Sequence, residues 1–497
     1  MIEKLLRKFF TKTTNYFRNV GLKEIFILTL FVFIGFNLIF FFNYSRYRID
    51  KEEKISVLKE GLFESVSTLN PLYAQNSSED SISILLYPPL ISPHNHQSLF
   101  IKKIEKSNDF LSYFIDINPE IKWSDGSKLS TEDIAFSFEL YKNYGPKSLR
   151  DFIKNVNFEI IDDSRGVFRL NFIDNLFIER LSQIRLLPSK WWNKFSQDNL
   201  LTERNLFKVG MFYFLSRWDD KKQEIVLNRN LFLSGPKINQ IIFKLYPNYI
   251  NALHSLLNRE IDALGDIRPE SLSIISHLRY NFYFSTTPRI IFIAFNREKV
   301  KPSKIFLPID FLKAKQYGEI LNGLFPESLR KILNIHPYKQ KEVTSEVEKF
   351  TLIATQEGLV NLIGKKIAEL NPNIKLKFIE LKDIQKLIED KNYEALLLGI
   401  DYGFPPNLAY FWSNLGLFLN KKEDKVLEKQ FQNLILGLNV NLSQTWSEIE
   451  DLILDSNQNL PIISPYYIYV IDRKIKADVP KFLPSEAYRF LNIYNWR

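Results

Sequence analysis

The chain has 497 residues, of which 45% are hydrophobic and 14% aromatic, which is enough for two or three packed units. It contains no cysteine, which excludes disulfides, thiolate nucleophiles and cysteine-based zinc sites. Residues 1–60 hold 11 Lys/Arg against 6 Asp/Glu, so +5 of the chain's net charge of +9 lies there. The remaining sequence has mixed charges and no basic stripe, and we therefore expect no nucleic-acid partner.

The first element in chain order is an uncharged, strongly apolar run of 18 residues, Ile25–Phe42. A helix rises about 1.5 Å per residue, so this run just crosses a bilayer core of roughly 30 Å. Basic residues flank the run, and no small-x-small cleavage site follows it. We interpret residues 25–43 as an uncleaved transmembrane signal anchor, with a basic cytoplasmic segment before it (1–24) and a stalk after it (44–56). A buried core helix and a cleaved signal peptide are the alternatives.

The orientation of this anchor follows from the basic residues on its two sides. Six precede the apolar run, and five follow it in a segment that also contains acidic residues. We therefore predict a single-pass protein of the cell membrane, with the N-terminus in the cytoplasm and residues 45–497 outside it.

Beyond the stalk, strand-like and helix-like segments alternate along the chain. Short apolar runs such as Ile241–Leu245, Ile290–Phe295 and Tyr393–Ile400 are typical of strands. Leu359–Leu370 places its leucines and isoleucines at helical spacing instead. Strands interleaved with helices predict an α/β protein.

The segment IKWSDGSKLSTEDIAFSFELYKN (121–143) has the most distinct local pattern. Trp123 ends an extended stretch, and Asp125-Gly126 predicts a tight turn. Ser130 is then an expected helix N-cap, with Asp133 three residues later in a variant of the capping box. By itself this pattern indicates a packing unit and no chemistry.

Part of the same segment, WSDGSKLSTEDIAFSF (123–138), resembles the signature of the family 5 extracellular solute-binding proteins. These are the oligopeptide- and dipeptide-binding components of ABC importers. Five further segments resemble other parts of that family in the family's order: 67–91, 209–248, 253–264, 290–296 and 393–407. The resemblance covers about residues 57–495.

The resemblance implies an α/β fold of the type 2 periplasmic-binding-protein class, with two lobes and an extra domain around a cleft, preceded by the one N-terminal transmembrane helix. Its expected parts are lobe I (57–90 with 205–282 and 475–497), domain II (91–204) and lobe III (283–474).

Three departures from the family's pattern bear on the ligand. The arginine and alanines of the helix that the family has after its crossover strand are missing beyond Asn296. The family's Gly-Pro-Tyr is replaced by Gly210-Met211-Phe212-Tyr213, and Phe404 stands before Pro405 where the family has an acid.

The implied function is that of a membrane-anchored extracytoplasmic protein that captures peptides in the cleft and delivers them to an ABC transporter. Its expected partners are a peptide ligand, the permease subunits and, through residues 25–43, the membrane. We expect a monomer. The alternatives are an envelope sensor or scaffold built on the same fold, and a variant that binds a non-peptide solute such as nickel, haem or a sugar.

Asp401 is the principal candidate site residue. It follows an apolar strand and matches the position where the family holds the ligand's α-ammonium group. A carboxylate in a closing, water-poor cleft forms a charge-assisted bond with an ammonium group and discriminates against ligands that lack one. The alternative is a turn-forming aspartate, which is common after strands.

Two further groups of candidates are implied by the resemblance. Gln75, Asn76 and Ser77 match a loop beside the ligand backbone, or they form an ordinary solvated loop. Aromatic side chains expected to line side-chain pockets, or otherwise to lie in the core, are Tyr402, Phe404 and Trp412.

Motifs of enzymes are missing from the sequence. It has no His-Glu-x-x-His, no Gly-x-Ser-x-Gly and no phosphate-binding glycine loop. His94 and His96 share a polar turn, but the sequence indicates no third and fourth metal ligand. We therefore predict no catalytic residues, no metal site and no cofactor.

Overall fold

The computed structural model describes residues 57–94, 96, 98–196, 200, 203–233, 235–296, 298–300, 305–338, 348–356, 358–406, 429, 442–455 and 459–497. The predicted anchor at 25–43 and the predicted site residue Trp412 lie outside these residues. Within the described part of the chain, no helix is both long and apolar enough to cross a bilayer.

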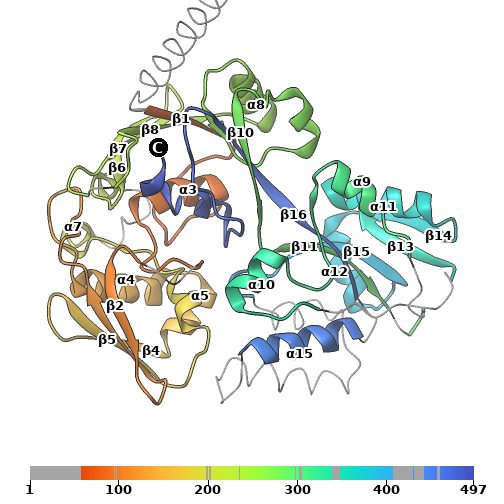
Figure 1. Cartoon of the computed structure of the whole chain (residues 1–497), viewed down its shortest axis with the longest axis horizontal. Helices are drawn as coiled ribbons and strands as arrows, with labels where there is room; N and C mark the ends of the chain where they lie inside the picture. The colour runs from red at the N-terminus through yellow and green to blue at the C-terminus, as the bar shows by residue number, and fades with distance from the viewer. Residues whose placement is uncertain are drawn as a thin grey trace, which may run out of the picture. The chain divides into compact units, whose positions relative to one another are not determined.

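A 12-stranded mixed sheet is the main structural feature (Figure 1). Its strands are β1 (Val57–Leu62), β6 (Tyr213–Asp219), β7 (Glu224–Arg229), β8 (Gln240–Leu245), β9 (Ala263–Leu264), β10 (Tyr280–Thr286), β11 (Arg289–Phe295), β12 (Gly318–Ile320), β13 (Phe350–Thr355), β14 (Ile374–Ile379), β15 (Ala395–Asp401) and β16 (Asn459–Asp472). The main path runs β14-β13-β15-β11-β16-β9-β1-β8-β7-β6, and β10 and β12 also pair with β16.

The long strand β16 belongs to both halves of this sheet. Its first residues pair with β11 and β12, and its last residues pair with β10 and β9. The sheet therefore continues from the β13–β15 side to the β1–β8 side through this strand.

The helices are distributed between and beside these strands. Their bounds are α3 (Ser77–Leu86), α4 (Thr131–Tyr144), α5 (Lys147–Ile153), α6 (Phe177–Leu181), α7 (Ser189–Trp192), α8 (Tyr249–Leu257), α9 (Ile309–Ala314), α10 (Glu327–Leu333), α11 (Gly358–Leu370), α12 (Leu381–Glu389) and α15 (Leu442–Asp455), with 3-10 turns η2 (Arg204–Lys208), η3 (Pro269–Ile274), η4 (Glu486–Phe490) and η5 (Ile493–Asn495). α11 connects the parallel strands β13 and β14, and α12 leads from β14 to β15. The predicted α/β class is confirmed.

A second, four-stranded antiparallel sheet lies in the segment between α3 and β6. It has the order β2-β3-β5-β4, formed by β2 (Ile101–Lys106), β3 (Ser112–Ile117), β4 (Val156–Ile160) and β5 (Arg165–Leu170). Figure 1 shows these strands in orange and yellow with α4 and α5 beside them. Phe138 of α4 packs against Phe158 and Phe168 of this sheet.

The predicted strand–turn–helix unit is present. Gly126 has a φ of +86°, which suits the expected tight turn, and Ser130 precedes α4. The buried Asp133 carboxylate accepts hydrogen bonds from the Trp123 indole (3.0 Å), the Ser130 amide (3.1 Å) and the Ser189 hydroxyl (2.7 Å). This one carboxylate thereby connects the turn, the start of α4 and α7.

The sequence of β11 is a continuous apolar run because both faces of the strand are buried. The even-numbered residues from Ile290 to Ala294 belong to one buried cluster, and the odd-numbered residues from Ile291 to Phe295 belong to another. Successive side chains of a strand point to opposite faces, so both faces of this part of the sheet are covered. The core therefore continues on both sides of β11.

Candidate functional site

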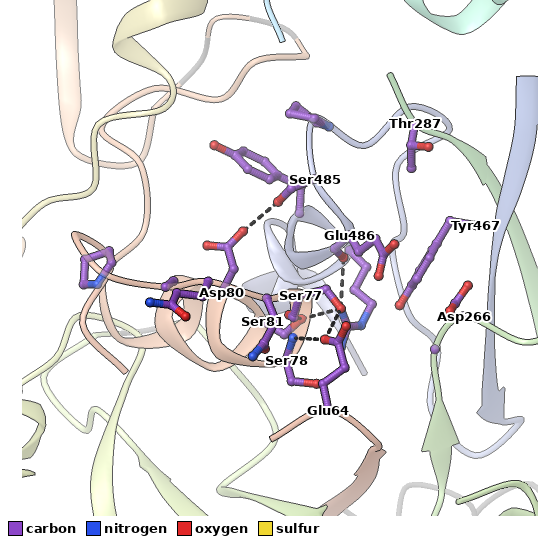
Figure 2. Close-up of a pocket in the computed structure, with 18 of the residues that line it drawn as sticks. Glu64, Ser77, Ser78, Asp80, Ser81, Asp266, Thr287, Tyr467, Ser485 and Glu486 are labelled. Carbon is purple, nitrogen blue, oxygen red and sulfur yellow. Dashed lines mark hydrogen bonds between the residues drawn. The ribbon is translucent and has the colours of Figure 1, made fainter. Parts of the chain in front are cut away.

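A pocket of about 730 Å³ brings together segments that lie far apart in the sequence. Its wall combines the end of β1, the start of α3, the residues after β9, the start of β11, the end of β15, part of β16 and η4. Figure 2 shows residues of this lining projecting from several of these elements toward one space. The volume lies within the range of roughly 300–1,000 Å³ that is usual for ligand sites.

The predicted residues Gln75 and Asn76 both line this pocket. Asn76 is the N-cap of α3, where its side chain accepts a hydrogen bond from the Glu79 amide (3.0 Å) and donates one to the Ser65 carbonyl (2.8 Å). Gln75 is exposed, and its backbone amide donates to Glu79 (2.8 Å). The Asn76 side chain is therefore used by the fold, whereas the Gln75 side chain is open to the pocket.

The third predicted loop residue, Ser77, also lines the pocket. Its hydroxyl donates to the Glu64 carboxylate (2.8 Å), which also accepts from the backbone amide of Ser78 (3.0 Å). Figure 2 shows Glu64 below the first turn of α3, with both bonds drawn. Glu64 is thus held against the first turn of α3, where the helix dipole favours a negative charge.

Asp401 lies at the end of β15, on the wall of the pocket. One carboxylate oxygen accepts from the Gly403 amide (2.9 Å), and the other lies 3.5 Å from Nε of Arg289. Its side chain is 54% exposed, so part of the carboxylate remains open to a ligand.

Arg289 is a pocket residue that sequence reasoning missed. It also pairs with Glu486 of η4, with Nη1 3.1 Å from the carboxylate. The antiparallel register of β11 and β15 places Arg289 directly opposite Asp401. The pair could be identified only from this register, which cannot be read from the sequence.

The two described aromatic candidates occupy different surroundings. Phe404 lines the pocket and packs against Phe482, and its carbonyl accepts a hydrogen bond from the Gln183 amide. Tyr402 is buried, stands edge-on to Phe325 with ring centroids 5.9 Å apart, and is not part of the lining. Burial raises the pKa of the Tyr402 hydroxyl well above its ordinary value. Tyr402 therefore lies in the core, the alternative given for it above.

Asp266 is a second charged residue that the sequence did not indicate. It follows β9 with a φ of +51° and is exposed to the pocket. Loss of solvent around it, together with the nearby negative charge of Glu486, raises the pKa of its carboxyl group to about 7. The preceding Gly265 is required here, since a Cβ atom on it would lie 2.0 Å from the Tyr467 hydroxyl.

Two arginines of the lining are already paired with carboxylates. Nη2 of Arg185 lies 2.9 Å from Asp80, and Nη2 of Arg489 lies 2.6 Å from the buried Glu60. These guanidinium groups are therefore largely neutralised by the protein itself.

Metal-binding geometry is not present in the described ranges, where no group of three or more His, Cys, Asp and Glu side chains is placed to hold an ion. His96, one of the two histidines of the polar turn, lies 3.2 Å from Glu179. The contact with Glu179 is the largest of the factors that raise the pKa of His96.

Comparison with known proteins supports the family resemblance. The middle-region model of the bacterial extracellular solute-binding proteins, family 5, matches residues 95–317. This match supports the family 5 resemblance seen in the sequence. Among its curated relatives, the "Probable peptide-binding protein YejA" of Agrobacterium fabrum is 23% identical over 163 residues, which are 32% of this chain and 26% of that protein. The chain thus aligns with about a quarter of the length of the curated relatives that it matches.

Solved structures of solute-binding proteins share the fold over most of the chain. CtaP of Listeria monocytogenes, an ABC transporter substrate-binding protein, has a TM-score of 0.73 at 17% identity, covering 88% of this chain and 98% of that one. NikA of Brucella suis, in complex with Fe(III)-EDTA, has a TM-score of 0.68 at 15% identity, covering 89% and 99%. The oligopeptide-binding protein AppA of Bacillus subtilis, in complex with a nonapeptide, has a TM-score of 0.57 at 14% identity, covering 88% and 98%.

These comparisons confirm the resemblance and the mixed α/β fold of the family 5 periplasmic binding proteins. The family 5 members and structural neighbours are solute-binding proteins, so the prediction of a binding protein and not an enzyme is also confirmed. The neighbours' ligands differ, from a peptide to an iron chelate, so the fold does not determine the ligand of this protein.

Proposed function

We propose that this family 5 protein captures short peptides in its pocket and delivers them to an ABC permease. The observation that carries the proposal is the convergence of the predicted loop, the predicted carboxylate Asp401 and Phe404 on one pocket of peptide-binding size. Relatives named as peptide-binding proteins add to this support.

The proposed anchor for the peptide's α-ammonium group is Asp401. Its carboxylate accepts one backbone hydrogen bond and has one guanidinium at 3.5 Å, which leaves acceptor capacity for an ammonium group. An ammonium–carboxylate contact gains strength when the pocket closes, because water is excluded from it.

Closure of the two lobes around the bound peptide is part of the same proposal. The lining includes residues of the proposed lobe I (57–90, 205–282 and 475–497) and of the proposed lobe III (283–474). A ligand that contacts both lobes at once has more contacts in the closed form and shifts the population toward it. The closed form is then the species that the permease recognises.

The decisive test is the affinity of the Asp401→Asn variant for peptides. We expect the full chain, in detergent, to bind short peptides in calorimetric titrations and to bind the same peptides about tenfold or more weakly when their amino group is acetylated. Asp401→Asn should weaken binding of the free peptide by a similar factor and remove the preference over the acetylated form. Asp390→Asn, at an exposed position after α12, is the matched control and should leave both affinities unchanged.

Two results would contradict this proposal in different ways. An intact preference for the free amino group in the Asp401→Asn variant would exclude Asp401 as the anchor. Failure of the unmodified chain to bind any member of a mixed peptide library would exclude peptide capture and favour the sensor or scaffold alternative.

The proposal also includes membrane attachment through residues 25–43, on the basis of the uncharged 18-residue run in the sequence. The full chain should remain in the membrane fraction after carbonate extraction, and a deletion of 25–43 should release it. Mass measurement of the mature N-terminus provides the second readout. A mature chain that begins shortly after Phe42 would establish the cleaved signal peptide instead.

A further inference from the structure

We infer that the pocket contains a second cation-binding position at Asp266, which takes a basic side chain of the ligand, so that the protein selects peptides carrying lysine or arginine. This inference rests on the proposed function and names the ligand class of the same pocket. It adds a residue that neither the family resemblance nor the sequence pattern indicated.

The position of Asp266 gives the first argument. Its side chain opens into the pocket, and among the described residues none forms a hydrogen bond or an ion pair with it. Figure 2 shows Asp266 beside Tyr467, with Glu486 nearby. The carboxylate is therefore available to a ligand, whereas the Asp401 carboxylate already has Arg289 next to it.

The charge balance of the lining gives the second argument. It contains five carboxylates and three guanidinium groups, which are Glu64, Asp80, Asp266, Asp401 and Glu486 against Arg185, Arg289 and Arg489. Arg185 pairs with Asp80, Arg489 pairs with Glu60 behind the wall, and Arg289 lies between Asp401 and Glu486. Because Arg489 is used by Glu60, the five lining carboxylates face only two guanidinium groups, an excess of three carboxylates, and a ligand with two positive charges reduces this excess.

The groups facing Asp266 come from several elements. Glu486 of η4 and Glu64 after β1 repel its negative charge, and Arg289 of β11 and Arg268 before η3 attract it. Tyr467 of β16 is a further titratable neighbour. The balance of these groups and the loss of solvent favours the protonated acid, with a pKa of about 7. A ligand cation placed here supplies the missing positive charge and displaces that proton.

The experiment compares two peptides that differ only in one charge. The probes are Ala-Lys-Ala and the same tripeptide acetylated at Nε of the lysine, titrated calorimetrically into the full chain at pH 6 and pH 8. We expect the lysine peptide to bind about tenfold tighter at pH 8 and to lose most of this advantage at pH 6, where Asp266 is mainly protonated.

Three variants assign the effect to this residue. Asp266→Asn should remove both the preference and its pH dependence while leaving the affinity for the acetylated peptide within about twofold. Asp266→Glu should keep the preference, and Asp390→Asn should behave as the unmodified chain. Thermal unfolding of each variant verifies that it is folded before titration.

The outcomes separate this inference from the proposed function. Equal binding of both peptides by the unmodified chain would overturn the inference and leave peptide capture intact. A preference that persists in Asp266→Asn would place the second cation at another carboxylate, such as Glu64, and would also overturn it. If the unmodified chain bound neither peptide and no peptide of the library, the proposed function would be overturned together with the inference.

Discussion

The carboxyl group of Asp266 links ligand selection to stability at the scale of a single residue. Its pKa in the folded chain, about 7, lies above the ordinary value of 3.8. Between these two values the folded state holds a proton that the unfolded state has lost. The contribution of Asp266 to the free energy of unfolding therefore falls as the pH rises from about 4 to 7, and stays low above that.

We accordingly expect Asp266→Asn to raise the melting temperature of the ligand-free chain at pH 8 and to change it little near pH 4.5. Asparagine also tolerates the positive φ of this position, so the substitution adds no backbone strain. Differential scanning calorimetry of the variant, the unmodified chain and Asp390→Asn at both pH values provides the measurement. An equal change at the two pH values would mean that the charge of Asp266 does not destabilise the fold.

Residues of this pocket differ in how far the sequence reveals them. Gln75, Asn76 and Ser77 follow one another in the chain at the start of α3, so a single local segment brings all three to the pocket wall. Arg289 and Asp266 gain their places only through strand pairing, opposite Asp401 in one case and after the short strand β9 in the other. Such non-local neighbours carry no local sequence signal.

Among the helices, strands and turns, too, those that were predicted have causes within a few residues, whereas those that were not predicted depend on distant parts of the chain. The turn at Asp125-Gly126 and the start of α4 at Ser130 were predicted because their causes lie within a few residues, a glycine with positive φ and a capping side chain. β16 was not predicted, because it contains Pro461 and Pro465, and proline is typical of strand edges and bulges. Its register with β11 does shift between Ile291 and Phe292, opposite this part of the strand.

The role of β16 follows from its position between the two halves of the sheet. It contacts β11 and β12 with its first half and β10 and β9 with its second half, so every path through the sheet from β13 to β1 passes along it. Tyr467 in its second half also lines the pocket. A change in the angle between the two halves therefore acts directly on the pocket wall, which is what the proposed closure requires.

At the scale of the whole molecule, the beginning and the end of the described chain are joined by a buried ion pair. Glu60 of β1 and Arg489 of η4 approach to 2.6 Å, and both side chains are almost fully buried. The Tyr469 hydroxyl donates to the same Glu60 carboxylate (2.8 Å), and Arg489 also donates to Ser81 of α3 (2.7 Å). The pair thus connects β1, α3, β16 and η4.

Removal of one partner should therefore destabilise the whole protein. Glu60→Gln or Arg489→Met leaves the other charge buried without its counter-ion, and we expect each to lower the free energy of unfolding by about 3 to 5 kcal/mol. The double variant should lose clearly less free energy of unfolding than the two single variants added together, because it leaves no unpaired charge. The exposed pair Arg204 and Asp220, 3.0 Å apart, is the control, and its disruption should lower the free energy of unfolding far less. Urea unfolding of the unmodified chain and the three variants of each cycle measures these values, and strict additivity at Glu60 and Arg489 would show that the two side chains stabilise the fold independently of each other.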